Sequence, residues 1–431
     1  MNHVKIMVSL LFLVGFVVAC ENGPKFSPTA PSAIEGSKSV MIETSVGTVS
    51  SANIIGINCG NPNDNLPDDD LLQSCLDRGD RIELQGGEPG YIVNGRHGDV
   101  RIGLWLKTPG TVLTSGGSGM SKIIAGRDLF APILQTTPHQ GVNNFTIDQI
   151  SFDGRVDDMV QGGAYRRRRD DCGLGGAPGN VVLQGNRFRF VNNESKNALC
   201  GTGLGLYGNF EVQNNYIASN GRDGYSRAPG YPWADGVTVL LCDGGYVAHN
   251  TIIDNTDIDL ILGGGQGCIV ELNTITHINK YSFCGLGIGN FQSPSAGNHS
   301  GSEYRGNSIY SKMAKKLSIG ICAGSHMWSI ATNVSNAGRV IGNTVVGASI
   351  GIVVDGVFGG EISGNNARDP IDDGTEEGPC RRSGLKYTVH PSHVKNTILQ
   401  EGWTSLRYDY DECKFGGDFE INKAIGVGFN R

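Results

Sequence analysis

The sequence has few charged residues, no basic excess and no apolar run of ordinary membrane-spanning length. Only 18% of its 431 residues are charged and the formal net charge is −7, whereas a general nucleic-acid-binding protein needs a basic excess to neutralise phosphates. We therefore expect no nucleic-acid partner. Cys-x-x-Cys is absent as well, so the usual spacing of a cysteine metal site is missing. With 65 glycines, the chain has no coiled-coil or disordered signature, and its turn-rich composition favours one elongated domain.

The N-terminus predicts an exported protein. Lys5 precedes a short apolar segment, residues 6–18, which is too short for an ordinary membrane span. The segment ends in Val-Val-Ala-Cys, which resembles a bacterial lipobox and implies lipidation of Cys20 after removal of a signal peptide, residues 1–19. Glu21 then fits onward export, so we expect a lipid anchor in the outer membrane or at the cell surface. Residues 20–52 are predicted to be a flexible tether; the alternative is an ordinary secretory signal.

The ten cysteines beyond Cys20 are an even number, as expected in an oxidising compartment where disulfides persist. Plausible local pairs are Cys59 with Cys75 and Cys380 with Cys413, one near each end. Four further cysteines near predicted strands can instead be buried thiols: Cys242, Cys268, Cys284 and Cys322.

An asparagine recurs along the chain, followed two residues later by an aliphatic or aromatic residue. The members are Asn186, Asn215, Asn250, Asn273, Asn307 and Asn343, at steps of 29, 35, 23, 34 and 36 residues. Such spacing indicates stacked repeats, and alternating runs such as Val237 and Val239 indicate strands. Equivalent residues of stacked strands lie about 4.8 Å apart, so we expect the asparagines to form a hydrogen-bonded ladder.

This pattern resembles the right-handed parallel β-helix of the pectate-lyase-like superfamily. The resemblance implies an all-β, single-stranded solenoid over residues 53–370. An acidic helix near Asp68–Gln73 would cap its N-terminal end, and an irregular segment, residues 371–431, would pack on the last coils as a C-terminal cap. We expect a monomer.

In such β-helices, long insertions between coils mark the binding site, which the resemblance places in a groove over one sheet. Two insertions combine basic and aromatic residues, and their members proposed to bind substrate are Arg167, Arg168, Arg222, Tyr225, Arg227 and Trp233. Guanidinium groups hold carboxylates and aromatic rings stack on sugars. An anionic polysaccharide is therefore the expected partner; a solvated charged loop is the alternative for the arginines.

Aligning Asn250 with Asn273 places Val237 and Val239 over Leu260 and Leu262. By alternation, Asp259 then faces outward, with Asp257 at the start of the same strand and Asp235 approaching from the neighbouring strand. Extending the alignment puts Phe283 and then Lys316 in the column of Asp257. The three aspartates can raise one another's pKa or bind Ca²⁺; alternatively they cap turns.

Two reactions can use this set. In a β-eliminating lyase, Lys280, Lys315 or Lys316 removes a proton and Tyr281 or Tyr225 protonates the leaving oxygen. In a glycoside hydrolase, two of the aspartates act as acid and base. His326 is a further candidate for substrate contact or proton transfer.

Family signatures do not decide between these reactions. Asn255-Thr256-Asp257 resembles one element of the polygalacturonase-like hydrolases, but their Gly-His-Gly and Arg-x-Lys are missing, as is the Trp-x-Asp-His of the pectate lyases proper. We expect a lyase acting on a uronate-containing polysaccharide. The alternatives are a hydrolase and a noncatalytic protein that binds glycan or serves in adhesion.

Overall fold

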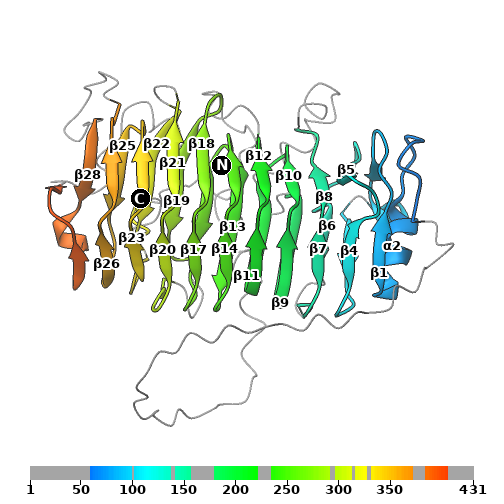
Figure 1. The fold of residues 1–431 in the computed structure, drawn as a ribbon, viewed down its shortest axis with the longest axis horizontal. Helices are drawn as coiled ribbons and strands as arrows, with labels where there is room; N and C mark the ends of the chain where they lie inside the picture. The colour runs from blue at the N-terminus through cyan, green and yellow to red at the C-terminus, as the bar shows by residue number, and fades with distance from the viewer. Residues whose placement is uncertain are drawn as a thin grey trace, which may run out of the picture.

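The chain winds into a stack of short coils, each built from parallel strands (Figure 1). The computed structural model describes residues 59–99, 101–136, 141–156, 179–221, 234–291, 297–312, 316–327, 332–371 and 384–405. Among these residues, no helix has both the length and the apolar content to span a bilayer.

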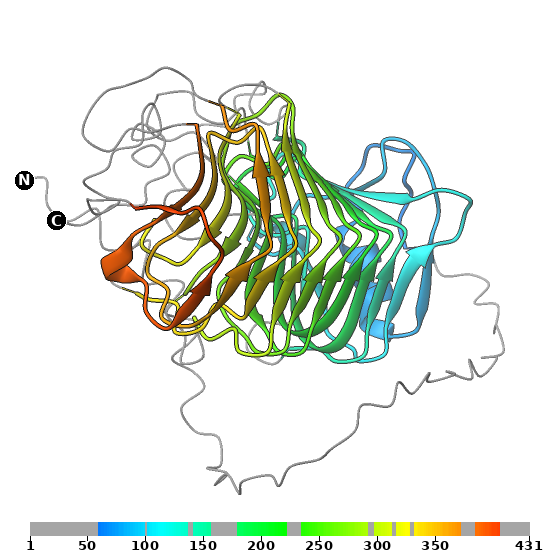
Figure 2. The ribbon, with the colours of Figure 1, turned by 60° about the vertical axis from the view of Figure 1, so that its left-hand side comes forward.

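Strands of successive coils pair in three ladders, named here in the order in which the chain passes through them from β3 onward. Every strand pairing in the ladders is parallel, and Figure 2 shows the coils in register. The first ladder contains β3 (Leu104–Leu106), β6 (Leu134–Thr136), β9 (Val181–Val191), β11 (Gly201–Gln213), β13 (Ala234–Cys242), β16 (Ile258–Leu262), β19 (Ser282–Ile288), β22 (Leu317–Ala323), β25 (Ile350–Val354), β28 (Leu385–Val389) and β30 (Thr404–Ser405).

The second ladder begins with short strands and shares two long ones with the first. It contains β1 (Arg81–Leu84), β4 (Val112–Ser115), β7 (Thr146–Asp148), the second halves of β9 and β11, β14 (Tyr246–Ala248), β17 (Ile269–Glu271), β20 (Glu303–Arg305), β23 (Arg339–Ile341), β26 (Gly360–Ser363) and β29 (Thr397–Leu399).

The third ladder forms a separate sheet and completes each coil. It contains β2 (Tyr91–Val93), β5 (Ser121–Ala125), β8 (Ile150–Asp153), β10 (Glu194–Lys196), β12 (Tyr216–Ala218), β15 (Thr251–Ile253), β18 (Thr274–His277), β21 (Ser308–Ser311), β24 (Thr344–Val346) and β27 (Asn366–Arg368). The expected parallel β-helix is therefore confirmed.

The two ends of the described stack differ. Helix α2 (Asp69–Arg78) lies at the N-terminal end and buries Leu72 and Leu76; a short 3₁₀ turn, η2 (Arg96–Gly98), follows β2. At the other end, β28, β29 and β30 extend the ladders beyond residue 370, where the sequence suggested an irregular cap. The apolar alternation in these strands is weak, which hid them. A second 3₁₀ turn, η3 (Pro391–His393), joins β28 to the last strands.

The asparagine ladder is present on the turn between the second and third ladders, and it is buried. Its members are Asn193, Asn215, Asn250, Asn273, Asn307, Asn343 and Asn365. From Asn215 onward, each Nδ2 donates to the Oδ1 of the next member at 2.9 Å. Gln400 follows Asn365 as an acceptor.

Asn186 was wrongly assigned to this ladder, because it is exposed in the middle of β9. The residue before each true member has a φ between 55° and 63°, which turns the chain into the third ladder. Gly185 has a φ of 151° instead. The sequence around Asn186 therefore matches the repeat, but the backbone does not turn there.

Three disulfides join cysteines of the described residues. Cys59 and Cys75 form the expected disulfide beside α2. Cys242 with Cys268 and Cys284 with Cys322 are also disulfides, so these four are not free thiols. The pair Cys380 and Cys413 lies outside the described residues.

Candidate functional site

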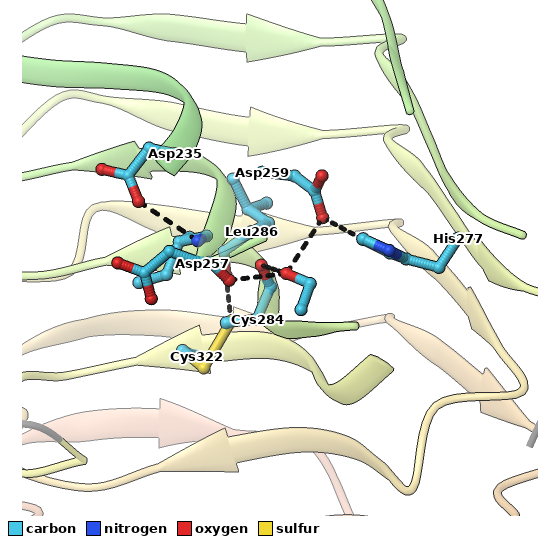
Figure 3. The surroundings of a disulfide bond; sticks show 9 residues. Asp235, Asp257, Asp259, His277, Cys284, Leu286 and Cys322 are labelled. Carbon is cyan, nitrogen blue, oxygen red and sulfur yellow. Dashed lines mark hydrogen bonds and ion pairs between the residues drawn. A yellow bond between two sulfur atoms is a disulfide. The ribbon is translucent and has the colours of Figure 1, made fainter. Parts of the chain in front are cut away.

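Two carboxyl groups meet where strands of the first ladder begin. Asp235 is the second residue of β13, and Asp257 immediately precedes β16 (Figure 3). Asp235 Oδ2 accepts a hydrogen bond from Thr238 Oγ1 at 2.6 Å, and its Oδ1 accepts one from the Ile258 N–H at 3.1 Å. These bonds aim the Asp235 carboxyl at Asp257, and the two side chains hydrogen bond to each other.

Burial raises the pKa of Asp235 to about 6, although its hydrogen bonds to Thr238 and the Ile258 N–H oppose the shift. Burial and the neighbouring Asp235 carboxylate raise the pKa of Asp257 well above its ordinary value. Asp257 is 9% exposed, while Asp235 is partly exposed. Two carboxyl groups in contact cannot both ionise cheaply, so the pair holds a proton near neutral pH.

Asp259 was expected beside this pair on the outer face, and the structure contradicts that expectation. The Asp259 side chain is fully buried and turns into the coil, where Oδ2 lies 2.5 Å from His277 Nε2 and Oδ1 accepts from Asn255 Nδ2 at 3.1 Å. In Figure 3, Asp259 and His277 lie on the far side of the strand from the Asp257 carboxyl. Asp259 therefore does not join the other two aspartates in a Ca²⁺ site.

The inward direction of Asp259 follows from a glycine column. A Cβ on Gly285 or Gly320, the next positions along the stack, would meet the side chain of Ile309 or Val345 inside the coil. This column breaks the strict alternation of the strands, and glycine gives no hydrophobic signal of sidedness.

His277 ends β18 and was not identified from the sequence. Burial opposes its protonation, but the charge and hydrogen bond of Asp259 outweigh burial, so the pKa of His277 is raised. Burial raises the pKa of Asp259, while His277 and Asn255 oppose that shift. The pair is a buried polar link between the first and third ladders.

The lysines and tyrosine predicted for catalysis lie beside the start of β19. Lys280 Nζ donates to the carbonyls of Ser219 and Gly221 at 2.9 and 2.7 Å. Lys316 Nζ donates to the Asn279 carbonyl at 2.5 Å and lies 4.2 Å from the centroid of the Tyr281 ring.

The predicted register at Lys316 was wrong by two residues. Ile319 pairs with Cys284, not with Leu286, so Ser318 continues the column of Asp257 and Phe283. The insertion before β22 contains no apolar repeat that fixes the register. Pairing Leu286 with either Ile319 or Ile321 therefore satisfies the alternation of apolar residues. Lys316 nevertheless approaches the site, because its carbonyl accepts the Ser282 N–H at 2.9 Å.

The outer face of the first ladder is apolar and buried beyond the aspartates, rather than lined with amines. Its cluster contains Ile258, Ile261, Phe283, Cys284, Ile319, Cys322, Met327, Ile350 and Val353. Phe291 and Leu385 pack against it. The polar part of this face is therefore concentrated at the start of the strands.

His326 lies apart from the aspartates, beyond the end of β22, where it contacts Asp355 and His393. Sequence reasoning missed the last two because the alignment of coils stopped at β22, before β25 and β28. Continuing the register of Ala323 with Val354 and Val389 would have brought the ends of these strands together.

The remaining predicted residues lie outside the described part of the chain. They are Cys20, Arg167, Arg168, Arg222, Tyr225, Arg227, Trp233 and Lys315. The predicted substrate-binding loops stay a prediction.

Comparisons with known proteins returned similar solved structures only. No family model and no curated protein matches the chain. The Dettilon tailspike protein is 13% identical with a TM-score of 0.45, and the match covers 78% of this chain and 65% of the tailspike chain. This chain thus spans less than two thirds of that protein.

The A-module of the Azotobacter vinelandii mannuronan C-5 epimerase AlgE4 is 12% identical with a TM-score of 0.34, and the match covers 81% of this chain and 96% of the module. The AlgE6 A-module is also 12% identical, with a TM-score of 0.32 and coverage of 80% and 96%. The pairing of its own strands identifies this chain as a parallel β-helix.

Proposed function

We propose that the protein is exported, anchored at Cys20, and acts on an anionic, uronate-containing polysaccharide by β-elimination. The observation that carries this proposal is the hydrogen-bonded Asp235–Asp257 pair, whose raised pKa values keep a proton at the start of the first ladder.

A β-elimination needs the charge of the uronate carboxylate to be offset, because only then is the adjacent C–H acidic enough to lose its proton. A carboxylic acid held in its protonated form can donate a hydrogen bond to that carboxylate. Asp257 suits this role, since its pKa lies well above the ordinary value; its O–H would turn from Asp235 to the uronate carboxylate when the substrate binds. The pair would thus offset the charge of the uronate carboxylate, a role that a metal ion or an arginine fills in other lyases.

Lys316 and Tyr281 supply the proton transfers. The base takes the proton next to the carboxylate, the electron pair forms a carbon–carbon double bond, the glycosidic C–O bond breaks, and the leaving oxygen takes a proton. Tyr281 precedes Ser282, whose Oγ donates to the Asp257 carbonyl at 2.6 Å, and Lys316 lies over the Tyr281 ring. These groups therefore sit at the same end of the strands as the acid pair.

The same geometry argues against hydrolysis by this pair. Glycosidases place their two carboxyl groups about 5–5.5 Å or about 6.5–9.5 Å apart. Asp235 and Asp257 interact directly instead, which is closer than either of these spacings.

The test is incubation of the purified protein with a panel of uronate polymers, followed by ultraviolet absorbance of unsaturated ends. Asp257→Ala should lower kcat/KM by at least about 100-fold, whereas Asp243→Ala, at an exposed carboxylate, should leave it unchanged. The wild-type rate should fall as pH rises and the pair loses its proton. New reducing ends without this absorbance would contradict the lyase proposal in favour of hydrolysis; polymer binding without either product would indicate a noncatalytic glycan-binding protein.

A further inference from the structure

A second cluster of ionisable side chains lies at the opposite end of the first ladder from the aspartate pair. Asp355 follows β25, His326 follows β22, and His393 ends η3 in the next coil. Asp355 Oδ1 lies 2.8 Å from His393 Nδ1 and 3.2 Å from His326 Nδ1. The two Nδ1 atoms are 3.1 Å apart. Three potential ligand atoms from three coils therefore face one point.

The hydrogen bonds around the cluster set the protonation of His326. Its Nε2 lies 2.9 Å from Asn333 Oδ1, an acceptor, so Nε2 carries the hydrogen and Nδ1 presents a lone pair to the cluster. The Asp355 oxygen is also an acceptor. His326 Nδ1 and Asp355 Oδ1 are then both acceptors, and the hydrogen on His393 Nδ1 is shared between them.

The burial of the Asp355 carboxylate is a second, independent observation that favours cation binding at this cluster. The carboxylate is fully buried, and its Oδ2 has no hydrogen-bond partner within the described chain. A buried carboxylate oxygen without a donor is costly. A cation bound at Oδ1 would offset the charge of this buried carboxylate and would hold the two imidazole nitrogens, which lie 3.1 Å apart.

We propose that His326, Asp355 and His393 bind a divalent transition-metal ion of the zinc class. A point about 1 Å out of the plane of the three atoms lies about 2.0–2.1 Å from each of them, the distance of zinc to imidazole nitrogen and carboxylate oxygen. Two nitrogen ligands select against Ca²⁺ and Mg²⁺, which take oxygen ligands.

The surroundings of His326 match those of a metal-bound histidine. Asn333 holds the far nitrogen of His326, as outer partners of metal-bound histidines do. The side chain of His393 is 23% exposed, so solvent reaches the cluster on the side of His393. Within the described residues, this is the one group of three histidine, cysteine or acidic residues whose ligand atoms lie within 4.8 Å of one another.

The direct test is titration of the chelator-stripped, purified protein with ZnCl₂ by calorimetry and with CoCl₂ by visible absorbance. We expect one equivalent of metal with the d–d bands of a four-coordinate nitrogen and oxygen site, a higher Tm in the presence of Zn²⁺, and no such response to CaCl₂.

His393→Asn should abolish binding, and Asn333→Ala should weaken it about 10- to 100-fold. His249→Asn, at an exposed histidine elsewhere, is the matched control and should bind like the wild type. His393 lies in a partly exposed turn, so its replacement spares the buried ladders. Absence of Zn²⁺ binding by the wild-type protein, or unchanged stoichiometry and affinity in His393→Asn, would overturn the proposal. Lyase activity is not used as a readout, so failure of the proposed function would leave this result intact.

Discussion

Replacing Asn273 by alanine removes one rung from the middle of the asparagine ladder. The Asn273 Nδ2 donates to the Val247 carbonyl at 3.0 Å and to Asn307 Oδ1 at 2.9 Å. Its Oδ1 accepts from the Asn250 N–H at 3.1 Å and from Asn250 Nδ2 at 2.9 Å. Alanine therefore deletes four hydrogen bonds at a position with no exposure.

The losses are unequal. Asn307 Oδ1 still accepts the Asn273 N–H, and Asn250 Nδ2 still donates to the Val212 carbonyl, so these two groups keep one partner each. The Asn250 N–H loses the acceptor that Asn273 provided. A buried group left unsatisfied costs about 1–3 kcal/mol and each of the three further hydrogen bonds contributes about 0.5–1.5 kcal/mol, so we expect the unfolding free energy to fall by about 2.5–7.5 kcal/mol.

Urea unfolding followed by far-ultraviolet circular dichroism measures this change. Asn186→Ala is the matched control, because Asn186 has the same residue type and a similar local motif but is exposed in β9; its effect should stay within about 0.5 kcal/mol. A loss below about 1 kcal/mol for Asn273→Ala, or equal losses for the two variants, would refute the argument that the ladder stabilises the coils.

Two further predictions concern the interior. The pKa of His277 is raised in the folded protein, so the stability that its protonation contributes is fully present below its unfolded pKa of about 6.5 and is lost as pH rises through the folded value. Asp259→Asn should lower the pKa of His277, because burial is then opposed only by the Lys280 carbonyl and the Asp254 carboxylate; an unchanged NMR titration of the His277 ring would contradict this. Gly320→Ala should destabilise by about 1–3 kcal/mol, since its Cβ would meet Val345 Cγ1 at 2.2 Å. Gly117→Ala, with no atom within 4 Å of the new Cβ, should be neutral in the same unfolding measurement.

The fold is predictable from the sequence because the repeated asparagines and the alternating apolar residues each indicate one kind of position in the coil. A buried asparagine after a residue of positive φ recurs at the turn into the third ladder, and Leu260 and Leu262 pair with Val237 and Val239 as the alternation requires. The same logic fails at Asn186, where the local sequence matches but the backbone continues as a strand.

The site is less predictable because it depends on direction and register at places with little hydrophobic signal. Asp259 stands in a column otherwise occupied by glycines such as Gly285 and Gly320, which do not reveal whether that column faces in or out. Lys316 follows an insertion of uncertain register, and two alternative alignments satisfy its apolar neighbours equally. Asp355 comes from a coil beyond the last one aligned, so no local motif could connect it with His326.

The asparagine ladder has a direction along the chain. From Asn215 to Asn343, every side-chain amide donates to the side-chain oxygen of the coil made after it. If the coils fold in order from the N-terminus, the newest coil therefore has one amide hydrogen without its final acceptor until the following coil docks. The growing end of the stack would carry one unsatisfied asparagine amide at every stage of such folding.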